Sequence, residues 1–182
     1  ATRMAAMRSG QLDFVLDPPV QDVAALKQDP NLRLIEGPEV RIIMIGFDQA
    51  RDELAFSDVK GKNPFKDRRV RLALYQAVDV NALKTSVMRG LSVPTAIPFP
   101  DWKGAGVAPA LDKRHPYDVA AAKKLLADAG YPNGFGFTLH CPNDRYVNDE
   151  KICTAVAAMW ARAGLKVTVD AMPKAQYFQR TP

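Results

Sequence analysis

The sequence predicts an α/β fold in a single domain, with a mixed sheet flanked by helices. Amphipathic stretches with apolar residues at helical spacing alternate with shorter apolar stretches that have the length of strands. Residues 40–47 are apolar at nearly every position, which is typical of a central strand covered on both faces. The 182 residues, of which 47% are hydrophobic, suffice for one domain with a sizeable core.

The N-terminal quarter of the chain predicts the order helix, strand, helix, strand, strand. The two helices are expected over 2–9 and 20–28. Every second residue from Leu12 to Leu16 is apolar, and this alternation indicates a strand that ends at the following prolines. Strands are therefore expected over three segments: 11–16, 32–35 and 40–47.

Two consecutive capped helices are expected over residues 63–91. Apolar residues recur at helical spacing in both, and Asp67 and Asp79 stand at their starts. An aspartate in this position accepts hydrogen bonds from N–H groups that have no partner inside the helix. Gly90 supplies the left-handed residue that ends the second helix. The buried face of this second helix is expected to consist of Leu83, Val87 and Met88.

The C-terminal part predicts helix, strand, loop, helix and strand. Asp118 is expected to cap a helix that ends at Gly130, because glycine favours the left-handed conformation found after helix ends. A strand over 135–140 follows, then a polar loop and a helix up to residue 163. A strand over 165–171, with alternating apolar residues, completes the pattern.

The net charge of +5 raises nucleic acid as a partner. The basic residues are densest between residues 60 and 71, where Phe65 is the one aromatic side chain. Single-stranded nucleic acids are usually bound where aromatic residues alternate with basic ones as stacking platforms. A solvated helix face is therefore the preferred interpretation, and no nucleic acid partner is expected.

The two cysteines, Cys141 and Cys153, are too few for a disulfide scaffold, and their spacing is not that of a zinc site. No metal or cofactor is expected from them. Two buried thiols are the preferred interpretation, because cysteine is a common core residue. One bridge between the strand end and the following helix is the alternative.

Catalytic chemistry is not indicated. His115 and His140 lie far apart in the sequence, and neither belongs to a zinc-protease, Ser–His–Asp or Cys–His pattern. Cys141 follows His140 directly, but adjacent residues on a strand point to opposite faces. An enzyme and a nucleic-acid-binding α/β domain are kept as the alternative functions.

Two stretches resemble the signature of family 5 of the extracellular solute-binding proteins, the oligopeptide and dipeptide receptors of ABC importers. Residues 65–79 follow the order F-x-D-x-R-V-R-x-A-L-x-x-A-V-D. Residues 117–135 follow the order Y-x-x-x-x-A-x-x-L-L-x-x-A-G-Y-x-x-G-F and run directly into a strand. The block that ends in A-G-L-K-V at residues 163–167 is also similar, so the resemblance extends over most of the chain.

The resemblance implies a bilobal periplasmic-binding-protein fold of type II, of which residues 1–182 form one α/β lobe. The expected function is to bind a small solute, a peptide first of all, between two lobes and to deliver it to the membrane permease of an ABC importer. The expected partners are thus this solute, the permease and a missing N-terminal lobe of the same protein. The expected location is the periplasm, or the cell exterior with a membrane anchor in a Gram-positive source.

Candidate ligand contacts follow from position, because ligands of open α/β sheets lie outside the carboxyl ends of strands. The strand 135–140 and its loop bring polar and aromatic side chains to such a place: His140, Asn143, Arg145 and Tyr146. Asparagine offers donors and an acceptor, and arginine offers a fork that suits a carboxylate. The proline-rich segment 92–116, expected to be ordered, adds Phe99 and Trp102 as an apolar wall or stacking face. Ordinary loop packing is the alternative for each residue.

Overall fold

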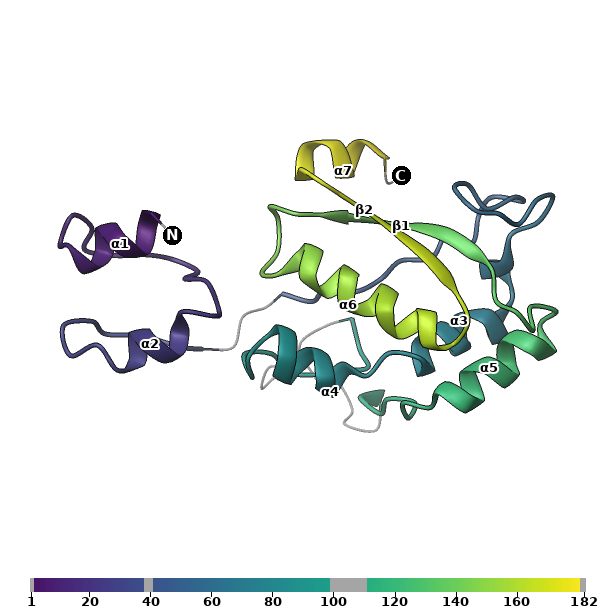
Figure 1. The fold of residues 1–182 in the computed structure, drawn as a ribbon, viewed down its shortest axis with the longest axis horizontal. Helices are drawn as coiled ribbons and strands as arrows, with labels where there is room; N and C mark the ends of the chain where they lie inside the picture. Colours follow the sequence, from purple (N-terminus) through teal and green to yellow (C-terminus); the bar gives the residue numbers. More distant parts are fainter. Residues whose placement is uncertain (1, 38–40, 99–110, 181–182) are drawn as a thin grey trace.

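The computed structural model describes residues 2–37, 41–98 and 111–180. Residues 2–37, with the first two helices, lie at one end of the molecule, and the other helices and strands gather at the other end (Figure 1). The α-helices and strands of the described residues are α1 (Thr2–Arg8), α2 (Val23–Lys27), α3 (Arg68–Gln76), α4 (Val80–Ala82), α5 (Val119–Asp128), β1 (Gly136–Pro142), α6 (Asp149–Arg162), β2 (Lys166–Met172) and α7 (Lys174–Arg180).

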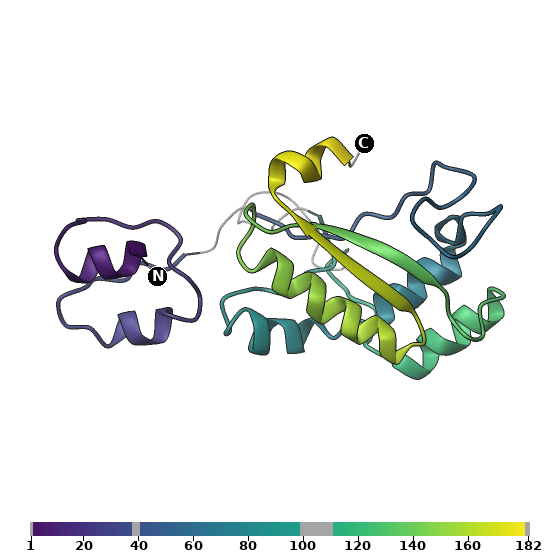
Figure 2. The same ribbon diagram turned by 45° about the horizontal axis from the view of Figure 1, so that its top comes forward.

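The centre of the larger part is a β1–α6–β2 unit. The two strands are parallel, with Gly136 opposite Lys166 and Pro142 opposite Met172, and α6 connects them. Ser57 adds an isolated antiparallel bridge to Phe137 outside this two-stranded parallel sheet. Helix α6 covers one side of the strands and α7 lies on the other (Figures 1 and 2). The predicted α/β fold with helices around a sheet is confirmed, but the sheet is small and parallel where a mixed one was expected.

The core lies between α6, the strands and the pair α3–α5. Its largest fully buried side chain is Trp160, which is 1% exposed and donates a hydrogen bond of 2.8 Å from Nε1 to the carbonyl oxygen of Leu74. This bond satisfies a polar atom that would otherwise be buried without a partner, and it joins α6 to α3. Phe65 and Phe137 pack edge to face beside it, with ring centroids 5.2 Å apart.

The predicted helix caps are confirmed. The carboxylates of Asp67, Asp79 and Asp118 accept hydrogen bonds from backbone N–H groups two or three residues further on, at distances of 2.8–3.0 Å. Gly130 has the left-handed conformation (φ +91°), and the N–H of Tyr131 donates to the carbonyl oxygen of Leu126 at 2.8 Å. This is the Schellman motif, which commonly ends helices at a glycine.

The second helix of residues 63–91 differs in part from the prediction. After α4 the chain forms one π-helical turn, Leu83–Val87, before Gly90 ends it with φ +85°. Leu83, Val87 and Met88 are only half-buried, so the expected buried face is wrong in degree. This segment packs against α6, and each of the three side chains keeps part of its surface in solvent.

The three N-terminal strands are the main correction. Residues 11–16, 32–35 and the described part of 40–47 are irregular, and none of them pairs in a ladder with any described residue. Phe14 is 70% exposed and Met44 is 63% exposed. The apolar pattern is that of a strand, but a strand forms only where another strand accepts and donates its backbone hydrogen bonds.

The described ends of the proline-rich segment are ordered against α3. The carboxylate of Asp112 accepts hydrogen bonds from the N–H of Ala96 and the hydroxyl of Thr95, and the first of these holds its pKa below the ordinary value. The guanidinium of Arg114 lies 4.5 Å from the ring centroid of Tyr75 on α3. Phe99 and Trp102, the two predicted contacts in this segment, lie outside the described residues.

Candidate functional site

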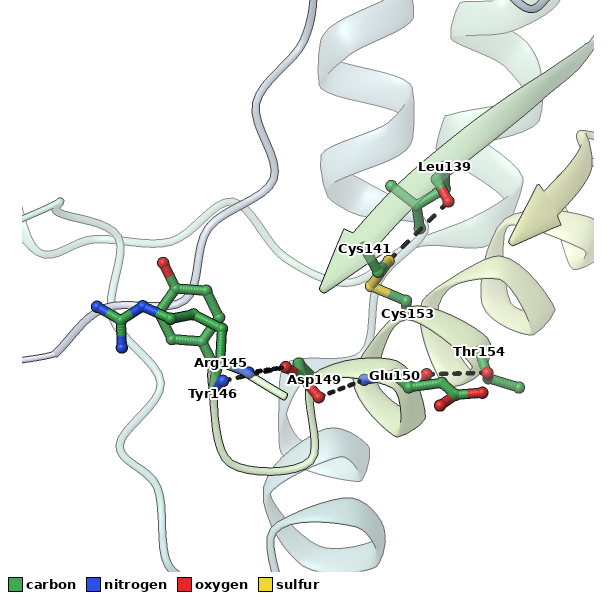
Figure 3. Close-up of a disulfide and its surroundings, with 8 residues drawn as sticks. All are labelled: Leu139, Cys141, Arg145, Tyr146, Asp149, Glu150, Cys153 and Thr154. Atoms are coloured by element: carbon green, nitrogen blue, oxygen red, sulfur yellow. Dashed lines mark hydrogen bonds between the residues drawn. A yellow bond between two sulfur atoms is a disulfide. The ribbon is translucent and has the colours of Figure 1, made fainter. Parts of the chain in front are cut away.

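The loop between β1 and α6 is organised by one buried carboxylate. Asp149, at the start of α6, is 7% exposed. Its Oδ2 accepts hydrogen bonds of 3.0 Å from the N–H groups of both Arg145 and Tyr146, and its Oδ1 accepts one from the N–H of Glu150 (Figure 3). These bonds satisfy the buried charge and hold the backbone of the predicted contact residues in place.

The loop is also tied at its first residues. The N–H of Asn143 donates to the carbonyl oxygen of Met172 at 3.0 Å, and the carboxylate of Asp144 accepts from the N–H of Lys174 at 2.6 Å. Asp144 thereby connects the loop to the start of α7. The side chain of Asn143, a predicted contact, is exposed at the carboxyl end of β1, where the prediction placed it.

A disulfide between Cys141 and Cys153 closes this loop (Figure 3). The preferred interpretation of two buried thiols is therefore wrong, and the alternative of one bridge is confirmed. Cys141 lies near the end of β1 and Cys153 lies in the second turn of α6. They meet because α6 folds back over β1, a packing that the sequence spacing alone did not reveal.

A groove of about 430 Å³ lies beside this loop. Tyr146 of the loop and Tyr177 and Phe178 of α7 form one part of its lining. The other part comes from the irregular segment 41–47: Ile42, Ile43, Met44 and Gly46. The lining is apolar and aromatic with two phenol groups, the combination that small-molecule sites commonly show.

Burial, with a smaller contribution from the neighbouring Tyr146, raises the pKa of Tyr177 above its ordinary value. The Tyr177 hydroxyl therefore stays protonated at neutral pH, and a phenol of this kind can both donate and accept a hydrogen bond. The guanidinium of Arg145 lies 4.9 Å from the ring centroid of Tyr146 and is exposed at the same loop. The groove thus joins apolar walls to polar groups at one of its sides.

His140, another predicted contact, is not among the residues that line the groove. Its Nδ1 lies 3.2 Å from Oδ2 of Asp170, its register partner on β2, and Phe56 packs edge to face on its ring. Oδ2 of Asp170 also accepts from Arg180 at 2.8 Å. His140 therefore takes part in a polar link between β1, β2 and α7, while its Nε2 is buried without a hydrogen-bond partner among the described residues.

Most residues of the groove were not predicted from the sequence. Tyr177 and Phe178 were not among the candidates, although an adjacent aromatic pair on a short helix is an available signal. Residues 42–46 were expected to be covered on both faces, and the structure leaves Ile43 and Met44 exposed.

Within the described ranges, no three His, Cys, Asp or Glu side chains are grouped as metal ligands. No helix of those ranges is long and apolar enough to cross a membrane.

Comparison with known proteins finds a matching family and similar proteins. The family model described as bacterial extracellular solute-binding proteins, family 5 middle, matches residues 1–181. Heme-binding protein A of Haemophilus influenzae is 31% identical over 98% of the chain, which corresponds to 31% of that protein. The glutathione-binding protein GsiB of Pectobacterium atrosepticum is 30% identical over 96% of the chain and 31% of its own length.

Solved structures show the same fold. A dipeptide-binding protein from Pseudoalteromonas sp. SM9913, in complex with Met-Leu, aligns with a TM-score of 0.74 at 21% identity over 98% of this chain and 33% of its own. The murein tripeptide binding protein MppA of Escherichia coli aligns with a TM-score of 0.74 at 25% identity, over 98% of this chain and 34% of its own. The chain thus spans about a third of the length of these relatives.

Proposed function

Because the chain belongs to family 5 of the bacterial extracellular solute-binding proteins, we propose that it forms one lobe of a solute receptor that serves an ABC importer. Its structural neighbours are bilobal binding proteins of type II. On this proposal the solute lies between residues 1–182 and a second lobe of the same protein, and contacts with both lobes favour the closed form. The receptor then passes the solute to the membrane permease.

The observation that carries this proposal is the groove beside the β1–α6 loop. Tyr146, a contact expected from its position after a strand, lines it together with Tyr177 and Phe178. The hydrogen bonds that Asp149 accepts and the disulfide hold the loop in one conformation. A preorganised contact surface lowers the entropic cost of binding. The groove is open on the solvent side, as a surface that receives a second wall on closure must be.

We propose a peptide or peptide-like molecule as the solute. The dipeptide-binding and murein-tripeptide-binding relatives support this class, whereas the heme-binding and glutathione-binding relatives show that the family also includes receptors for other solutes. An apolar, aromatic groove suits a peptide side chain. Arg145 and Asn143 at its loop suit a carboxylate and a peptide carbonyl group.

The remaining site predictions enter the proposal in different roles. Phe99 and Trp102 stay predictions for an apolar wall. His140 would contribute to binding indirectly, because it contacts Asp170, which accepts a hydrogen bond from Arg180 of α7. The proposed location is the periplasm, or the cell exterior in an anchored form, in agreement with the extracellular family to which the chain belongs.

Mass spectrometry of the solute retained by the full-length protein tests the function directly. The expected result is a co-purified peptide or other small solute that is released on denaturation and that binds again to the emptied protein. A protein that retains nothing, and that binds none of a library of dipeptides, tripeptides, glutathione and heme in calorimetry, would contradict the proposal.

Tyr146→Ala tests the groove. The variant is expected to bind the identified solute about tenfold more weakly or worse, because a partly buried aromatic contact at an interface contributes one or more kcal/mol. Tyr117→Ala is the matched control, since Tyr117 is an exposed tyrosine that does not line the groove. Calorimetric titration of both variants measures the difference, and equal affinities would exclude Tyr146 as a contact.

A further inference from the structure

A second, smaller pocket is lined by Asn148, at the end of the β1–α6 loop, whereas the groove is lined by Tyr146 of the same loop. Its volume is about 230 Å³. Its lining combines the end of the π-helical turn and a residue after it, the start of α6 and a short part of the N-terminal region: Val20, Gln21, Ser86, Val87, Arg89, Asn148 and Lys151. The predicted ligand contacts include none of these residues.

The charges of this pocket are all positive. Arg89 and Lys151 line it, and no aspartate or glutamate does. Within the described part of the chain, neither of the two forms an ion pair, whereas Lys66, Arg69 and Lys124 each have a carboxylate within 2.6 Å. Both cations line the same pocket, so an anion bound in it would be stabilised by both charges.

The local structure holds the two cations at the same pocket. The Asn148 side chain donates from Nδ2 to the carbonyl oxygen of Val87 at 2.9 Å, which joins the start of α6 to the end of the π-helical turn. Lys151 follows in the first turn of α6, and Arg89 follows Val87 by two residues. Asp149, which lies between Asn148 and Lys151 in the sequence, directs both oxygens to backbone N–H groups of the loop and of α6.

Neutral hydrogen-bonding groups complete the lining. The Ser86 hydroxyl and the Gln21 amide can each donate a hydrogen bond to an oxygen atom in the pocket. An arginine fork and a lysine ammonium beside such donors are the groups that proteins use for carboxylates and phosphates. We propose that this pocket binds the carboxylate or phosphate group of a small anion. The site does not depend on which solute the neighbouring groove receives.

The test follows Lys151 in the full-length protein. The lysines are reductively methylated with a ¹³C label, which retains their charge, and the Lys151 signal is assigned by its loss in Lys151→Arg. Inorganic phosphate and succinate are titrated separately at constant ionic strength, because they distinguish a phosphate source from a carboxylate source. At least one of them is expected to shift the Lys151 signal to saturation, whereas chloride is not.

Arg89→Gln is expected to lower the affinity for the anion about tenfold, because it removes one of the two charged partners. Arg162→Gln is the matched control, since it removes the same charge from the far end of α6 and leaves the pocket unchanged. Saturation by neither anion would overturn the proposal. An affinity that is the same in Arg89→Gln and Arg162→Gln would also overturn it, because the shift would then report the net charge alone.

Discussion

Asp149 is the single residue on which the conformation of the β1–α6 loop depends most. A buried carboxylate is costly unless hydrogen bonds replace its lost water, and here three backbone N–H groups do so. Two of these groups belong to Arg145 and Tyr146, the proposed contact residues. A residue that touches no ligand thus sets the position of two that are proposed to do so.

Asp149→Ala is expected to destabilise the protein by about 1–3 kcal/mol, because it leaves part-buried N–H groups without this acceptor. The amide hydrogens of Arg145 and Tyr146 should exchange faster, and hydrogen exchange measured by mass spectrometry detects this. Glu150→Ala is the control: it removes an exposed acid from the same helical turn. If the two loop amides stayed protected in Asp149→Ala, the loop would have to be held by its other bonds.

At the scale of elements, two turns bring β1 and β2 into register. Gly134 precedes β1 and Gly164 precedes β2, and a Cβ atom on Gly134 would lie 2.0 Å from the carbonyl oxygen of Gly164. Gly134 also has φ +68°, which side chains with a Cβ rarely adopt. The start of the parallel pair therefore requires glycine for two independent reasons.

Gly134→Ala is expected to cost more than about 2 kcal/mol of unfolding free energy, since the strained φ and the steric clash add. Gly61→Ala is the matched control. Gly61 has φ +72° but nothing within 4 Å of a Cβ atom, so its substitution should cost only about 1 kcal/mol. Urea unfolding of both variants separates the two causes, and equal losses would show that the close approach can relax.

The disulfide acts at the same scale. It joins the end of β1 to α6, so the polar loop between them cannot move away from the strand. Bonds of this kind stabilise a fold by restricting the unfolded chain. Together with Asp149 it gives the loop two anchors, one covalent and one electrostatic.

For the whole molecule, the exposed apolar segments of the N-terminal region agree with the proposal of a second lobe. Residues 11–16, 32–35 and 41–47 have the composition of strands without a strand partner among the described residues. The solved relatives are about three times as long as this chain, and the remainder of such a protein is the proposed partner.

These 182 residues alone are expected to bind the solute of the full-length protein only at about millimolar concentration or more weakly. A micromolar ligand corresponds to about 8 kcal/mol, and the loss of half its contacts leaves about 4 kcal/mol. Calorimetric titration of both proteins, with circular dichroism as the control for folding, tests this. Micromolar binding by residues 1–182 would contradict the proposal that a second lobe is needed.

The sequence by itself determined the caps at Asp67, Asp79 and Asp118 and the helix end at Gly130. These features arise from hydrogen bonds between residues at most five positions apart, so the local sequence contains all their causes. It also indicated the β1–α6–β2 order and the place of Tyr146, because periodicity and strand ends are local patterns.

Only the tertiary structure decided the disulfide, the partners of His140 and the groove. Cys141 and Cys153, His140 and Asp170, and Tyr146 and Tyr177 are brought together by the packing of α6, β2 and α7 around β1. The segment 41–47 also shows that local sequence does not specify tertiary contacts. Its apolar sequence favours a strand, but strand pairing needs a distant backbone whose position no local pattern specifies.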